Sequence, residues 1–150
     1  MLILLSSCAA PNSWKFESID TQETLFSAAR LLYSNGESPI RFEILRNIES
    51  EIYAFLSLTK YHFTPAREVK IEFSSNEERW EETVPLLEGN MRLRFPTEMT
   101  EKIIARLQEG KQVVMMLDGF EQCLDPAGFA SQYEKMGHIF QNPFKGLFDP

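Results

Sequence analysis

The carboxylates that could serve in acid–base chemistry gather in one short segment, SNEERWEE, at residues 75–82. Hydrolysis of a glycosidic bond needs two carboxylic acids that face each other across a cleft, and a tryptophan beside them offers a ring on which a sugar can stack. The segment supplies both residue types, in Glu77, Glu78, Glu81, Glu82 and Trp80. A solvated turn with the tryptophan in the core is the simpler interpretation, because glutamates are mostly exposed. A carbohydrate-active enzyme is therefore kept as a remote alternative.

The chain has only two histidines that could take part in catalysis or metal binding. His62 ends an aromatic strand and His138 follows the last predicted helix, and no Cys, Asp or Glu is spaced to complete a zinc site or a catalytic triad. The sequence also contains no Gly-rich phosphate loop and no nucleophile elbow. We therefore expect no catalytic residue, no metal site and no cofactor.

The first eight residues, MLILLSSC, end in the pattern of a bacterial lipoprotein signal. Leu5 is followed by two small residues and then by Cys8, at the position that receives diacylglycerol and becomes the new N-terminus after cleavage. Two or three acyl chains hold a protein far more firmly than one chain does. We expect residues 1–7 to be a signal remnant, residues 8–13 a tether to the membrane, and residues 14–150 a single globular domain.

Two further features bear on this lipoprotein hypothesis. Ala9, in place of Asp, resembles the sorting preference of Gram-negative lipoproteins sent to the outer membrane, so we expect anchoring there, facing the periplasm. Signal peptides normally have a basic segment and 7–15 apolar residues, whereas only seven residues precede Cys8 and none is charged. The alternatives are a start codon placed too late, or a soluble ligand-binding or inhibitor-like domain in which the first eight residues belong to the fold.

The chain has two cysteines, and the second is Cys123. A disulfide between the two is the alternative to lipidation of Cys8. If Cys8 carries lipid, Cys123 is left as a lone thiol, which is safest when buried in an oxidising compartment. We therefore expect Cys123 to point inward.

Composition narrows the class of partner. Fifteen Lys and Arg against 22 Asp and Glu give a net charge of -7, which argues against nucleic acid and anionic lipid headgroups as partners. A length of 150 residues with 43% hydrophobic residues suits one globular domain. Past residue 8, no apolar run approaches the roughly 20 residues that cross a bilayer.

Short strands with a two-residue period dominate the middle of the chain. In PIRFEIL, Ile40, Phe42 and Ile44 alternate with charged residues. Comparable runs occupy residues 51–63, 68–73, 79–87 and 91–95. The first of these is apolar on both faces, as a central strand would be, and Pro85 makes the third an edge strand or a strand end. The pattern predicts a mainly β fold with short helices, built as an antiparallel β-sandwich, with a barrel as the alternative.

Helices are expected late in the chain. Thr97 is the predicted N-cap of a helix that ends at Gly110 and whose apolar face is formed by Met99, Ile103 and Leu107. A C-terminal helix is expected over residues 125–137, with Asp125 as N-cap, Pro126 in the first position, and a stripe of Phe129, Tyr133 and Met136.

Two other segments are harder to assign. Residues 111–124 predict a buried strand that continues or turns back at Asp118-Gly119, with Met115 and Met116 in its core. In residues 20–36, the capping pair Asp20 and Glu23 favours a helix, but the apolar residues that follow would equally fill a sandwich as a strand.

From Trp14 onward the order of features resembles small secreted β-sandwich proteins of Gram-negative bacteria, the invasion-associated locus B group and the type VI secretion-associated lipoproteins. The similarity lies in WKFES, in VKIEFSSNEERW, in MRLRFPTEMTEKIIARLQEGKQVVMML and in DGFEQCLDPAGF. The disulfide cysteines of the locus B group are absent. The resemblance implies a strand at residues 22–34 and a non-enzymatic envelope or secreted role, and it transfers no catalytic residue.

The tail HIFQNPFKGLF has an unusual density of apolar side chains outside any clear element. It contains Phe140, Phe144, Leu147 and Phe148. These residues either pack over an open end of the sandwich or form an exposed patch for a partner, to which Trp80 is a further candidate contributor. The sequence thus predicts a lipid-anchored envelope protein that binds protein or peptidoglycan and catalyses nothing.

Overall fold

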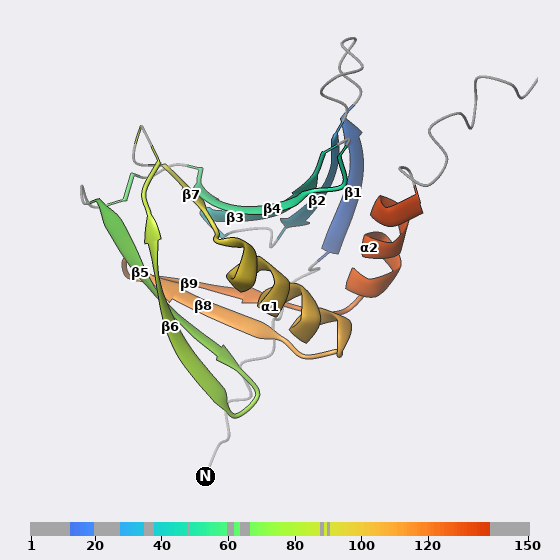
Figure 1. Ribbon diagram of the computed structural model, residues 1–150. Helices are drawn as coiled ribbons and strands as arrows, with labels where there is room; N and C mark the ends of the chain where they lie inside the picture. The colour runs from blue at the N-terminus through green and yellow to red at the C-terminus, as the bar shows by residue number, and fades with distance from the viewer. Residues whose placement is uncertain are drawn as a thin grey trace, which may run out of the picture.

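The computed structural model describes residues 13–19, 28–34, 38–47, 49–59, 62–63, 67–87, 89 and 91–138. Within these residues the chain forms nine strands and two helices, in two antiparallel sheets that pack as a β-sandwich (Figure 1). This is the mainly β fold with short helices that the periodicity predicts. One cluster of buried side chains draws on both sheets and both helices.

The first sheet has five strands in the order β1-β2-β3-β4-β7. They are β1 (Ser13–Ile19), β2 (Ala28–Ser34), β3 (Ile40–Arg46), β4 (Ile52–Leu58) and β7 (Arg92–Arg94). The predicted alternation in β3 is confirmed, because Ile40, Phe42 and Ile44 are all buried. β4 is interior to the sheet, as its two-sided apolar character predicts.

The second sheet has four strands in the order β6-β5-β8-β9. They are β5 (Glu68–Ser75), β6 (Glu78–Pro85), β8 (Val113–Leu117) and β9 (Phe120–Leu124). β6 lies at the edge of the sheet, and Pro85 is its last residue. Proline has no backbone N–H, and at this position none is needed for a hydrogen bond to a neighbouring strand. A bridge between Leu86 and Leu93 connects the two sheets at one corner.

The sequence left open whether the chain turns back at Asp118-Gly119, and the structure shows a hairpin there. Asp118 has φ 45° and Gly119 has φ 79°, which is the pair of left-handed conformations that a two-residue type I′ turn requires. Met115 is fully buried, but Met116 is 44% exposed, so the prediction that both methionines lie in the core is wrong for the second. Adjacent residues of a strand point to opposite faces, and only one face of this sheet meets the core.

Helix α1 (Thr97–Gln108) contacts β4 of the first sheet and β8 of the second, and lies between the two sheets in Figure 1. Its apolar face is the predicted one, with Met99, Ile103 and Leu107 buried. The N-cap position is Pro96 rather than Thr97.

Helix α2 (Phe129–His138) packs against β1 and β2 and touches α1. It begins later than the sequence predicts, because Asp125 caps a turn instead of the helix: its side-chain oxygen accepts a hydrogen bond from the N–H of Ala127 at 2.9 Å. Phe129 and Met136 of the predicted stripe are buried, and Tyr133 is half-buried.

The ambiguous segment is a strand where it is described. Residues 28–34 form β2, so the local preference for a helix is wrong there, while residues 20–27 lie outside the described residues. β2 lies between β1 and β3, and its Leu31 and Tyr33 side chains are buried in the core. Pairing with two neighbouring strands therefore outweighs the helix propensity of this stretch.

Candidate functional site

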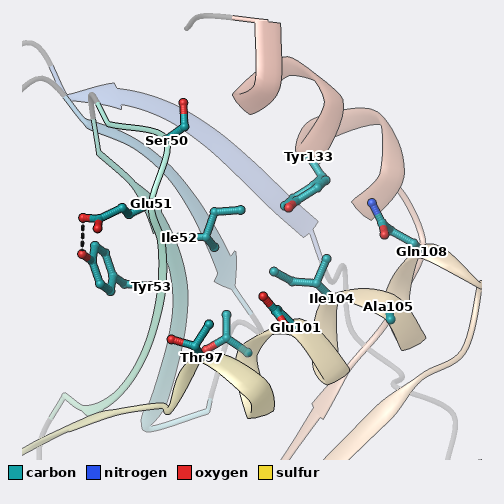
Figure 2. A pocket seen from close by; sticks show the side chains of 11 residues that line it. Ser50, Glu51, Ile52, Tyr53, Thr97, Glu101, Ile104, Ala105, Gln108 and Tyr133 are labelled. Carbon is teal, nitrogen blue, oxygen red and sulfur yellow. Dashed lines mark hydrogen bonds between the residues drawn. The ribbon is translucent and has the colours of Figure 1, made fainter.

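A cleft of about 570 Å³ lies where the start of β4 meets α1 and α2. Figure 2 shows Ile52 of β4, Ile104 of α1 and Tyr133 of α2 converging on it from their three elements. Glu101 of α1 projects into the same space. The cleft thus has an apolar floor and a carboxylate at its side.

The turn before β4 holds one rim of the cleft in place. The side-chain oxygen of Asn47 accepts hydrogen bonds from the N–H groups of Glu49 at 3.0 Å and Glu51 at 2.9 Å. The Asn47 amide in turn donates to the Glu51 carboxylate at 2.7 Å. Ser50 has φ 65° within this turn. Asparagine is suited to such turns because its short side chain bonds to nearby backbone groups.

Glu51 and Tyr53 form a pair at this rim. The Tyr53 hydroxyl donates to the Glu51 carboxylate at 2.5 Å, and this bond, with a smaller contribution from Asn47, holds the pKa of Glu51 below its ordinary value. The same bond raises the pKa of Tyr53. Figure 2 shows both side chains on the side of β4 away from Tyr133. Glu51 is therefore an ionised acceptor that is already occupied and is poorly suited to act as a general acid.

Tyr133 contributes a protonated phenol to the cleft. Burial raises its pKa, and the nearby Glu101 carboxylate raises it further, while Arg46 acts in the opposite direction. Thr97 and Gln108 add polar groups along α1. Among the described residues that line the cleft there is no histidine and no cysteine. The arrangement suits a ligand with an apolar body and N–H donors.

The predicted carboxylate cluster lies mostly on β6, and its members point to opposite faces of that strand. Glu78 pairs with Lys102 at 3.0 Å and with Arg106, both on α1. Glu81 pairs instead with Lys70 at 3.2 Å, on the outer face of the second sheet. Because residues at odd spacing along a strand point to opposite faces, these two carboxylates cannot reach the same bond of a substrate.

Glu81 is placed beside carboxylates of other strands instead. It lines a second cavity of about 580 Å³ together with Glu72, Glu121 and Trp80. Glu72 lies directly opposite Glu81 in the β5–β6 ladder, and the Lys70 ammonium contacts both carboxylates, at 4.0 Å and 3.2 Å respectively. Three strands, β5, β6 and β9, contribute these carboxylates, so the segment SNEERWEE does not reveal the group.

Trp80, a candidate partner-binding residue, makes its ring contacts within the chain. The indole stacks on Phe73 with ring centroids 5.1 Å apart and planes 8° apart. The Lys102 ammonium lies 4.0 Å from the ring centroid. The ring is packed against the hydrophobic core and is half-buried. It therefore fits the core interpretation better than an exposed stacking platform.

Several predicted residues lie outside the described residues or take a minor role. Cys8 and the apolar tail residues Phe140, Phe144, Leu147 and Phe148 lie outside them. His62 is exposed, and its Nδ1 lies 3.1 Å from the Gly89 carbonyl, where it serves as the donor. No group of three or more His, Cys, Asp and Glu in the described part of the chain is arranged to hold a metal ion.

Cys123 is disulfide-bonded. It lies half-buried on β9, with its Sγ 3.8 Å from the side-chain oxygen of Gln112. The expectation of a lone inward thiol is therefore wrong. Val114, its register partner on β8, is on the face of the second sheet that is opposite to the buried Val113 and Met115.

The cleft is not found by sequence reasoning, because its lining comes from three elements far apart in the chain. The sequence predicts Tyr133 only as part of the apolar stripe of a helix, and Glu101 has the spacing of an ordinary exposed helix residue. The one local signal is the Asn47 turn, which marks where β4 must begin.

Comparison of this chain with protein-family models, curated proteins and solved structures found no match. Within the described residues no helix has the length and apolar character needed to span a membrane.

Proposed function

We propose that this protein is an exported binding domain of the bacterial cell envelope that recognises a partner without catalysing a reaction. The observation that carries the proposal is the disulfide at Cys123. Disulfides persist in the periplasm and outside the cell and are rare in the reducing cytosol. A sandwich with a preformed cleft, in which Glu51 is already engaged, is better suited to binding than to proton transfer.

The cleft between β4, α1 and α2 is the proposed binding site. Ile52, Ile104 and the Tyr133 ring would cover an apolar side chain, while Glu101 and Gln108 would accept hydrogen bonds from a basic one. A chain of net charge -7 also attracts cationic segments over a distance. We therefore propose a peptide segment with basic and apolar residues as the ligand, and the peptidoglycan stem as the alternative.

Attachment to the outer membrane through Cys8 is the second part of the proposal, and it competes with the disulfide. A lipid thioether and an intrachain disulfide with Cys123 both need the Cys8 sulfur, so one molecule can have only one of them. The lipid-anchored form faces the periplasm and requires a Cys123 that is not bonded to Cys8. The soluble ligand-binding form, which the Cys123 disulfide favours, needs no lipid.

Peptide mapping without reduction tests export and separates these two forms. Protein from the periplasmic and membrane fractions of a Gram-negative host is alkylated before digestion. A linked Cys8–Cys123 peptide indicates the soluble form, and an acylated Cys8 peptide that is lost in C8A indicates the anchored form. If both cysteines are alkylated as free thiols and Met1 is retained, the proposal of an exported protein is wrong.

Binding to the cleft is tested with a fluorescein-labelled peptide of alternating Lys and Leu, and by sedimentation with purified sacculi. A105W fills the cleft from an exposed position of α1, and E101Q removes its carboxylate. E98Q is the matched control, because Glu98 is exposed on the same helix but does not line the cleft. We expect at least fivefold weaker peptide binding in A105W and E101Q and no change in E98Q. Equal affinity in all four proteins would refute the cleft as the site.

The remote carbohydrate-active alternative now depends on Glu72 and Glu81 rather than on the cluster around Trp80. These two residues line one cavity and face each other across a ladder. The carbohydrate-active alternative predicts that the protein hydrolyses sacculi and that E72Q and E81Q each abolish this activity. Absence of released muropeptides from the wild-type protein would dismiss it.

A further inference from the structure

The outer face of the first sheet carries a group of cationic side chains that the acidic composition does not predict. Side chains alternate between the two faces of a strand, and Ile40, Phe42 and Ile44 of β3 are buried. Arg41 and Glu43 therefore point to the outer face, and so do the residues paired with them on neighbouring strands. Its cations are Lys15, Arg30, Arg41, Arg92 and Arg94, and its carboxylates are Glu17 and Glu43, with Glu51 at its edge beside Tyr53 and Arg94. Cations outnumber carboxylates here, although the chain as a whole has a net charge of -7. We call this surface the arginine face.

The arginine face is the side of the first sheet opposite the core. In Figure 1, α1 and the second sheet both lie on the other side of this sheet. Lys15, Arg41 and Arg94 are exposed. The face is therefore distinct from the floor of the cleft, which is formed between β4 and the two helices, and its proposed role goes beyond the cleft.

Its arginines are held in place before any partner arrives. The Arg92 guanidinium lies 3.9 Å from the centroid of the Phe55 ring and donates to Glu43 at 2.5 Å. The Arg94 guanidinium lies 4.3 Å from the centroid of the Tyr53 ring. Stacking of this kind fixes the plane of a guanidinium and leaves its edge N–H groups available to carboxylates.

Glu43 organises the centre of the arginine face. It is only 6% exposed, and Arg30 at 3.6 Å and Arg92 approach it from the two sides. Arg30 also hydrogen-bonds to Glu17. Arg41 has no ion-pair partner within the described residues and is exposed. One buried carboxylate thus gathers arginines whose charge it only partly neutralises.

Apolar and aromatic side chains lie among these charges. Leu32, Leu45, Tyr53 and Phe55 are half-buried on the same face. Arg and aromatic residues are enriched at protein interfaces and Lys is depleted there, and this face has one Lys among its cations. A surface adapted to anionic membranes would instead carry a larger cluster of exposed cations than Lys15, Arg41 and Arg94.

We infer that the arginine face binds an acidic polypeptide that has apolar residues between its carboxylates. The carboxylates pair with Arg41 and Arg94, and the apolar residues cover Phe55 and its neighbours. The cations of the arginine face attract an acidic segment, and the rest of this acidic chain repels it, so electrostatics direct the segment to this face.

The test is a titration with a fluorescein-labelled twelve-residue peptide of alternating Glu and Leu, followed by anisotropy. We expect R41E/R94E to weaken binding about tenfold or more. The control K70E/R79E makes the same charge change at exposed positions on the outer face of the second sheet and should alter binding less than twofold. Binding to wild type should weaken steeply between 50 and 300 mM salt.

Three results would overturn the inference. They are wild-type affinity in R41E/R94E, equal losses in both double variants, and tighter binding to phosphatidylglycerol vesicles than to the peptide. R41Q/R94Q, which adds no negative charge, provides the same test if the reversed variant unfolds, and unfolding is checked by circular dichroism. A105W should keep its affinity for the acidic peptide, so failure of the cleft proposal is distinguishable from failure of this one.

Discussion

The two tryptophans of this chain should respond differently to the same substitution. The Trp14 indole N–H donates to the Asp125 carbonyl at 2.7 Å, and Trp14 is 5% exposed. The Trp80 indole N–H is buried and has no hydrogen-bond acceptor within the described residues. W14F therefore breaks a hydrogen bond, whereas W80F removes a donor that is unpaired.

The difference in cost follows from these contacts. Losing the Trp14 bond and leaving the Asp125 carbonyl unpaired costs about 1–3 kcal/mol. W80F weakens the cation–π interaction with Lys102, which is worth about 0.5–1 kcal/mol at a partly exposed site, and this loss is offset by removal of the unpaired N–H. We expect W14F to be less stable than W80F by about 1–2 kcal/mol, or roughly 2–8 °C in Tm for a chain of this size.

Urea unfolding followed by far-ultraviolet circular dichroism measures both variants against wild type. An unchanged slope with denaturant shows that the difference reflects stability and not a change in the unfolded chain. W14F should also loosen α2, because Trp14 contacts Phe129 with ring centroids 4.8 Å apart. If W80F proves as costly as W14F or more so, the assignment of the Trp14 hydrogen bond as the distinguishing interaction is wrong.

Three further predictions concern stability. The hydrogen bond from Arg30 holds the pKa of Glu17 below its ordinary value of 4.5. The stability that this pair contributes is therefore complete above pH 4.5 and is lost as the pH falls through the lower pKa of the folded state. E17Q should flatten the decline in Tm that is measured below pH 4.5. Reduction with dithiothreitol should lower the free energy of unfolding by about 2–4 kcal/mol in wild type and leave C123S unchanged, and an equal response would contradict an intrachain disulfide. G119A should cost about 1–2 kcal/mol in urea unfolding, because the β8–β9 turn needs φ 79° there, and a neutral result would argue against a type I′ turn.

Much of the fold can be predicted from short stretches of the sequence. Alternation in β3 and β5 predicts which side chains are buried, because successive residues of a strand must point to opposite faces. The face of α1 and the turn at Asp118-Gly119 are equally local, since helical spacing and left-handed backbone preferences act within a few residues.

The candidate site cannot be predicted from short stretches of the sequence. Ile52, Ile104 and Tyr133 meet only because β4, α1 and α2 pack together, and none has an unusual local pattern. The arginine face likewise depends on register: Arg94 of β7 lies opposite Phe55 of β4, which lies opposite Glu43 of β3, and β7 is distant in sequence from the other two strands.

The sequence by itself determined the mainly β class, the acidic balance and most element positions, because these follow from composition and from periods of two and 3.6 residues. Tertiary structure decided that residues 28–34 are a strand, because its neighbours offer a complete ladder and a buried face that an isolated helix would lack. It also decided which charges gather, since a sheet places side chains from separate strands within contact distance regardless of their separation along the chain.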